Sequence, residues 1–153
     1  MERLGRSVIG NAGWFAAVRA ELAAGRCVTV CPKGTSMHPA IRERADVLTL
    51  EPCGGADVHV GDIVLALASD PAGVVLHRVI RIGHDGVVLM GDANLSRREY
   101  CAGDDVVGRV VSIVRDGRCV PVRRWSDVIY RLPVLLRRLL VTVVLKFNSP
   151  HKK

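Results

Sequence analysis

Two side chains of this sequence have the chemistry of a nucleophile and a general base. Ser36 lies in the run Gly34-Thr35-Ser36-Met37-His38-Pro39, and His77 lies within a long apolar segment. A serine hydroxyl becomes a useful nucleophile only when a base within hydrogen-bond reach takes its proton. An imidazole with the reference pKa of about 6.5 is largely neutral at pH 7 and can act as that base. The pair therefore indicates nucleophilic catalysis, provided that the fold brings the two side chains together.

Each of these residues also has a purely structural interpretation. Gly, Thr, Ser and Pro are common turn residues, so residues 34–39 alone are typical of an ordinary loop. A single histidine on a strand is more often structural than catalytic, and His38, His59 and His84 are interpreted as structural. Arg78 is interpreted as a solvated or salt-bridged residue. The choice between a catalytic and a structural role depends on the secondary-structure elements that hold Ser36 and His77.

Apolar runs separated by turn residues predict a β-rich body. The predicted strands cover residues 27–31, 46–50, 63–67, 74–82, 87–90, 105–114 and 119–122. Asp85-Gly86 and Asp116-Gly117 predict hairpins, and residues 91–104 are expected to form a polar loop. Ser36 then follows the first strand, and His77 lies on the fourth.

A helix is expected at each end of this body. The first covers residues 11–24 and has apolar side chains at helical spacing that predict packing on the core, namely Trp14, Phe15, Val18 and Leu22. The second covers residues 126–147, interleaves leucine with arginine, and is interrupted by Pro133. Such a helix lies in a membrane interface, or packs on the β body or a partner subunit. The predicted organisation is an N-terminal helix (1–25), a β domain (26–122) and a C-terminal basic apolar helix (123–153).

The composition limits the classes of partner and cofactor. A chain of 153 residues can bury a core without disulfides or metals, and no cofactor is expected. Cys27 and Cys31 lack the two-residue spacing of zinc knuckles, so they are interpreted as small buried residues and not as metal ligands. The net charge of +7 permits nucleic acid, anionic lipid or an acidic partner. Only about 25 residues precede the β body, too few for a helix-turn-helix domain, so specific nucleic-acid binding is not expected.

The sequence also predicts where the protein works. The first residues lack the apolar core of a signal peptide, and no stretch reaches ~18 uninterrupted apolar residues. The cysteines do not suggest a disulfide framework, which favours a reducing compartment. A cytoplasmic protein, or one at the membrane surface, is therefore expected.

Four ordered segments resemble the signal peptidase I superfamily, which also includes the self-cleaving phage and SOS repressors. They are residues 34–39, Val60-Gly61-Asp62-Ile63-Val64, His77-Arg78-Val79-Ile80, and Gly91-Asp92-Ala93-Asn94 with the later Asp105-Val106-Val107-Gly108-Arg109-Val110. The resemblance covers roughly residues 28–114. It implies a mainly β body of the signal peptidase/repressor-protease type and a serine endopeptidase that cleaves an extended protein or leader peptide, with small side chains before the cut.

The resemblance also implies roles by position. Ser36 matches the serine nucleophile, and His77 falls where the archaeal and endoplasmic-reticulum type of signal peptidase has its histidine, followed by Arg as here. An acid orients such a histidine, and Asp92 is the first choice, with Asp105 the second. The residues expected to hold the oxyanion or substrate surround the serine, namely Gly34, Thr35, Met37 and Pro39.

The sequence departs from this family in two respects. The Ser–His branch usually has another Asp after its Gly-Asp segment, but residues 95–99 read Leu-Ser-Arg-Arg-Glu. The acid is missing or displaced, to Glu99 or Asp104. The N-terminal membrane anchor of the family is also absent, so any membrane contact is expected to be peripheral, through residues 126–147. The alternative, prompted by Arg97 and Arg98, is a catalytically degenerate fold that serves as a binding or regulatory module.

Overall fold

Strands make up most of the chain that the structure describes. The computed structural model describes residues 11–69, 73–94 and 97–122, together with 132, 133, 135–137, 139, 140 and 143. The elements are α1 (Asn11–Ala23), β1 (Val28–Val30), β2 (Asp46–Pro52), β3 (Ile63–Ala68), β4 (Gly73–Ile82), β5 (Gly86–Met90), β6 (Glu99–Ala102), the 3-10 turn η1 (Gly103–Asp105), β7 (Val106–Arg115) and β8 (Arg118–Val120). The prediction of a mainly β protein with an N-terminal helix is confirmed.

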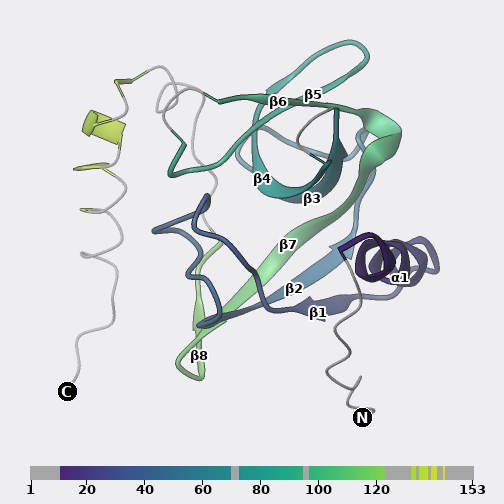
Figure 1. Ribbon diagram of the computed structural model, residues 1–153, viewed down its shortest axis with the longest axis horizontal. Coiled ribbons are helices and arrows are strands. Elements are labelled where there is room, and N and C mark those ends of the chain that lie inside the picture. The colour runs from purple at the N-terminus through teal and green to yellow at the C-terminus, as the bar shows by residue number, and fades with distance from the viewer. Residues whose placement is uncertain are drawn as a thin grey trace.

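The strands form one antiparallel sheet that curls into a half-barrel (Figure 1). The order across the sheet is β1-β2-β7-β3-β4-β5-β6, and β8 pairs with β7. Both predicted hairpins are present, since β4 pairs with β5 and β7 pairs with β8. At the second hairpin Asp116 and Gly117 have φ of 50° and 75°, the left-handed values that a tight two-residue turn needs.

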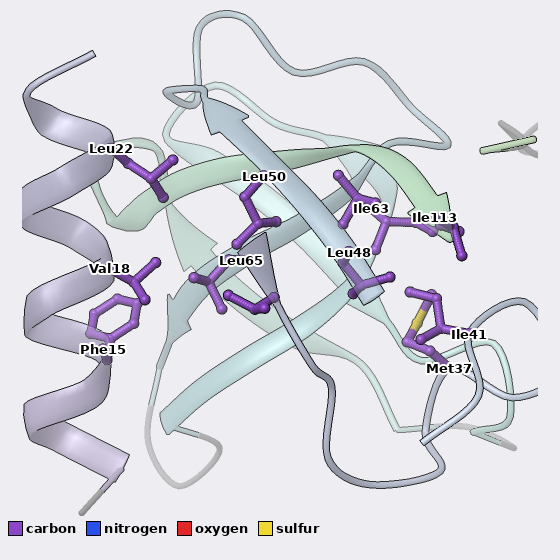
Figure 2. Packing of buried hydrophobic residues seen from close by; sticks show 12 residues of the cluster. Phe15, Val18, Leu22, Met37, Ile41, Leu48, Leu50, Ile63, Leu65 and Ile113 are labelled. Carbon is purple, nitrogen blue, oxygen red and sulfur yellow. The ribbon is translucent and has the colours of Figure 1, made fainter. Parts of the chain in front are cut away.

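The main core lies between α1 and one face of the sheet. Phe15, Val18 and Leu22 point from α1 toward the strands, where they join a buried cluster that contains Leu50 and Leu65 (Figure 2). The expected core-facing stripe of α1 is therefore confirmed for these three residues. Trp14, the fourth predicted member, is 36% exposed.

Gly108 allows α1 to lie close to the sheet. A Cβ atom at this position of β7 would lie 2.8 Å from Leu22 Cδ1 and 3.1 Å from the Glu51 carbonyl oxygen. Both distances are shorter than ordinary contacts, so a side chain here would force Leu22 to repack between α1 and the sheet.

Two expectations from the sequence are wrong. Residues 91–104 are not all loop, because β6 forms within them and pairs with β5, with Glu99 opposite Leu89. The alternation is present, since Glu99 and Cys101 are buried and Tyr100 and Ala102 are exposed. The sequence pattern does not predict this strand because one of its inward-facing residues is Glu99, and charged residues are typical of loops. Cys27 and Cys31 were expected to be buried, but both are exposed.

The predicted C-terminal helix over residues 126–147 lies largely outside the described residues, as do residues 1–10. Residues 135–137, 139, 140 and 143 are described and are helical. None of the helices in the described part of the chain has the length and apolar character needed to cross a membrane.

Candidate active site

The loop after β1 presents Ser36 at the edge of the core. Gly34 has φ of 89°, a left-handed value that turns the chain at low cost. The His38 N–H donates to the Thr35 carbonyl at 3.0 Å, and the Ile41 N–H donates to the Met37 carbonyl at 2.9 Å. Met37 and Ile41 are buried in the main core. These two side chains anchor the loop to the core and so hold Ser36 in place.

The strand β4 brings His77 to this loop. His77 pairs with Val64 of β3 and is buried. Its Nε2 atom lies 2.9 Å from Ser36 Oγ, although the two residues are 41 positions apart in sequence. The nucleophile and base proposed from the sequence are therefore within hydrogen-bond distance of each other.

Glu99 of β6 occupies the other side of the imidazole. His77 Nδ1 lies 2.8 Å from Glu99 Oε2, and both side chains are buried. A carboxylate can only accept, so Nδ1 carries the hydrogen and Nε2 is left to accept the Ser36 hydroxyl proton. The second carboxylate oxygen lies 3.4 Å from Nε of the exposed Arg97. The three side chains Ser36, His77 and Glu99 form one continuous hydrogen-bonded chain.

The sequence predicts Asp92 as the acid beside His77, with Asp105 as the second choice. The structure instead places Glu99 in this position. Asp92 accepts hydrogen bonds from Nε and Nη2 of Arg78 at 2.8 and 2.7 Å. Asp105 lies in η1, beyond the end of β6. Burial raises the pKa of the Cys101 thiol to about 11, and the Asp105 charge adds to this effect. The sequence places a displaced acid at Glu99 or Asp104, and of these two Glu99 contacts His77.

Arg78 and Asp92 have a supporting position behind the site. Successive side chains of a strand point to opposite faces, so Arg78 points away from the face on which His77 meets Ser36. Its Nη1 atom donates to the Gly61 carbonyl at 2.8 Å, and both partners of the Arg78–Asp92 ion pair are 1% exposed. This ion pair joins β4 to the turn before β3 and to the loop after β5.

The loop after β5 supports the backbone of the nucleophile directly. The Ala93 N–H donates to the Ser36 carbonyl at 2.8 Å. A Cβ atom on Gly91 would lie 2.6 Å from the same carbonyl oxygen and 2.9 Å from Asn94 Nδ2. The position of Ser36 therefore depends on the absence of a side chain at residue 91.

Substitution of Gly91 by Ala is expected to displace the Ser36 loop, because the new methyl group cannot coexist with the Ser36 carbonyl. Displacement of a reacting group by about 1 Å can cost about 100-fold in rate, and the crowding costs about 1–3 kcal/mol of stability. Turnover and the free energy of unfolding would be measured together. Gly54→Ala is the matched control, because a Cβ there meets no described atom within 4 Å and the backbone of Gly54 is not in the left-handed region. Unchanged turnover in Gly91→Ala would contradict the supporting role of this loop.

A cavity of about 130 Å³ opens beside the hydroxyl of Ser36. It is lined by Pro32, Lys33, Gly34, Ser36, Met37, Ile41, Val74, Val75, Leu76 and His77. Of the predicted substrate-binding residues, Gly34 and Met37 line this cavity and Thr35 and Pro39 do not. Thr35 is exposed beside it. Within the described part of the chain, the Ser36 N–H makes no hydrogen bond, so it is available as an oxyanion donor.

The first half of β4 borders the same cavity and has one unpaired edge. β4 pairs with β3 from Gly73 to Arg78 but with β5 only from Arg78 to Ile82. Among the described strands, none pairs with residues 73–77 on the side away from β3. Residues 74–77 therefore border the cavity with a strand edge that has no strand partner in the described part of the chain.

Comparison of the chain with models of protein families, with curated proteins and with solved structures found no match. The function is therefore inferred from the residues and from the geometry of Ser36, His77 and Glu99.

Proposed function

We propose that this protein is a serine endopeptidase in which Ser36 is the nucleophile, His77 the general base and Glu99 the acid that orients the imidazole. The observation that carries the proposal is the pair of hydrogen bonds on His77, 2.9 Å to Ser36 Oγ and 2.8 Å to Glu99 Oε2. A buried carboxylate at Nδ1 fixes the tautomer that can accept a proton at Nε2, and it stabilises the imidazolium that forms.

The proposed reaction has two stages. In the first, Ser36 Oγ attacks the carbonyl carbon of the scissile peptide bond while its proton moves to His77 Nε2. The tetrahedral oxyanion forms beside the Ser36 N–H. The carbon–nitrogen bond then breaks, and His77 gives its proton to the leaving amine. In the second stage, water attacks the acyl ester while His77 takes a proton from that water. The ester carbon–oxygen bond then breaks, and His77 returns the proton to Ser36 Oγ as the acid product leaves.

The substrate is proposed to bind as an extended strand along residues 73–77 of β4. Addition of a strand to an open sheet edge satisfies the backbone of the peptide and leaves the side chains to determine specificity. The cavity beside Ser36 is about 130 Å³ and is lined by both apolar and polar groups. A cavity of about 150 Å³ holds a benzene-sized group, so this one suits a small or medium side chain next to the scissile bond.

The four ordered segments support a β body of the signal peptidase/repressor-protease type, of the Ser–His branch. In this interpretation the protein processes a precursor or leader peptide. The alternative of a catalytically degenerate binding module was prompted by Arg97 and Arg98, which stand where an acid was expected. A carboxylate one position later, at Glu99, contacts His77, which favours an enzyme over a binding module.

Digestion of a proteome-derived peptide library would test the proposal without a known substrate. Wild type is expected to produce new peptide termini, and Ser36→Ala and His77→Ala are expected to produce none. Ser69→Ala is the matched control, because Ser69 is an exposed serine outside the cavity. Precursors encoded near the gene would be co-expressed with the same variants and their intact masses read. Cleavage by Ser36→Ala would refute the mechanism, and no cleavage by folded wild type would favour the binding module.

A further inference from the structure

The described part of the C-terminal segment has an exposed apolar face. Leu135 is 79% exposed and Leu139 is 61% exposed, and the other exposed aliphatic side chains are Leu136, Leu140 and Val143. All five residues are helical. Their spacing of i, i+1, i+4, i+5 and i+8 places them on one face of a helix. Packing on the β body, one of the roles considered for this helix, does not account for that face.

The same segment holds the whole net charge of the protein. Residues 123–153 contain eight Lys and Arg residues and one acid, Asp127, which gives +7. Subtraction from the totals of 22 basic and 15 acidic residues leaves 14 of each in residues 1–122, a net charge of zero. The apolar face therefore lies within a strongly basic segment, next to a body with no net charge.

One arginine attaches this segment to the body close to the candidate active site. Arg137 is 2% exposed. Its Nη2 atom donates to the Asn94 carbonyl, and Nη1 lies 3.7 Å from Met90 Sδ. Helical spacing places residue 137 well away from the face formed by the leucines. Asn94 follows Ala93, whose N–H donates to the Ser36 carbonyl.

We propose that the exposed apolar face formed by Leu135, Leu136, Leu139, Leu140 and Val143 binds the surface of an anionic lipid membrane. An apolar helical face among basic residues suits the boundary between acyl chains and negatively charged headgroups. A second copy of the same segment would bring two charges of +7 together, and a nucleic acid would leave the leucines in water. An anionic lipid surface can both neutralise the positive charge of this segment and bury its exposed leucine side chains.

Membrane binding would have a consequence for the proposed peptidase, and that consequence rests on the proposed function. The described helical residues and α1 lie on opposite sides of the body (Figure 1). Arg137 links the former to the loop that supports Ser36. A membrane-bound molecule would therefore hold its active site near the lipid surface and cut chains that are themselves membrane-associated.

Vesicle co-sedimentation of the full chain tests the proposal. The vesicles would be phosphatidylcholine alone, or phosphatidylcholine with about 30% phosphatidylglycerol to supply negative charge. Leu135→Gln/Leu139→Gln removes two exposed apolar side chains that the fold does not use. Ile82→Gln/Val111→Gln is the matched control, because Ile82 and Val111 are exposed aliphatic residues on the strands.

Wild type is expected to bind the anionic vesicles and to release as salt is raised. The leucine double variant is expected to bind at least about tenfold more weakly, and the strand control is expected to bind like wild type. Absence of binding by wild type, or equal binding by the leucine variant, would overturn the proposal. Loss of a dimer in the leucine variant, measured by light scattering, would overturn it in favour of self-association. Ser36→Ala is expected to bind like wild type, so failure of lipid binding and failure of catalysis are separable.

Discussion

Replacement of Glu99 by Gln is expected to lower kcat by about 10⁴-fold with little change in the fold. Gln is nearly isosteric with Glu, but its amide can donate a hydrogen bond to His77 Nδ1. The imidazole would then carry its hydrogen on Nε2, the atom that lies 2.9 Å from Ser36 Oγ. In that tautomer Nε2 cannot accept the serine proton, and the imidazolium loses its stabilising charge.

Measurement of kcat and KM with a library-derived peptide would check this prediction, with circular dichroism as the test of folding. A loss confined to kcat is expected, because Glu99 is not among the residues that line the cavity. A proton NMR signal from His77 Nδ1–H, hydrogen-bonded to Glu99 in the wild type, is expected to shift or disappear in the variant. If Glu99→Gln retained more than a tenth of the wild-type kcat, the role of Glu99 would be disproved.

Replacement of Asp92 by Asn is expected to lower the free energy of unfolding by about 3–5 kcal/mol. The change removes the carboxylate charge that pairs with the Arg78 guanidinium, which is 1% exposed. A buried charge without a partner costs far more than the intact pair contributes. The expected effect is therefore on stability, although Asp92 is the residue that the sequence pointed to as the catalytic acid.

Urea denaturation would measure this loss, and a double variant would identify its cause. Arg78→Met in the Asp92→Asn background removes the stranded charge and is expected to recover part of the stability. Under conditions in which Asp92→Asn remains folded, its pH–rate profile should keep the wild-type shape, whereas Glu99→Gln should not. An unfolding free energy within about 1 kcal/mol of wild type would contradict the structural role of Asp92.

Residues 28–82 were predictable from sequence because local signals there agree with one another. Alternating apolar runs and Gly-rich turns place Ser36 after a strand and His77 on another, and the two side chains meet as expected. Glu99 could not be assigned in the same way. Its strand has four residues, and its contact with His77 depends on the register of β5 and β6 beside β4. Such register is a property of the whole sheet and not of the local sequence.

The role of Asp92 illustrates a second limit. A Gly-Asp segment in the same sequence as a predicted catalytic histidine suggests a catalytic carboxylate. Arg78, in turn, is interpreted from the sequence as solvated or salt-bridged. Neighbouring residues of a strand face opposite sides of the sheet, so the acid that pairs with Arg78 is on the wrong side to reach His77. Only the three-dimensional arrangement shows which of two nearby acids lies on which side.

The open edge of β4 also affects how the protein behaves at high concentration. An unpaired strand edge is a template on which another chain can add a strand, and no strand in the described part of the chain pairs with residues 73–77 on the side away from β3. Another molecule of the same protein can compete for this edge with a peptide. Activity per molecule is then expected to fall as protein concentration rises, and a saturating peptide is expected to keep concentrated samples from aggregating.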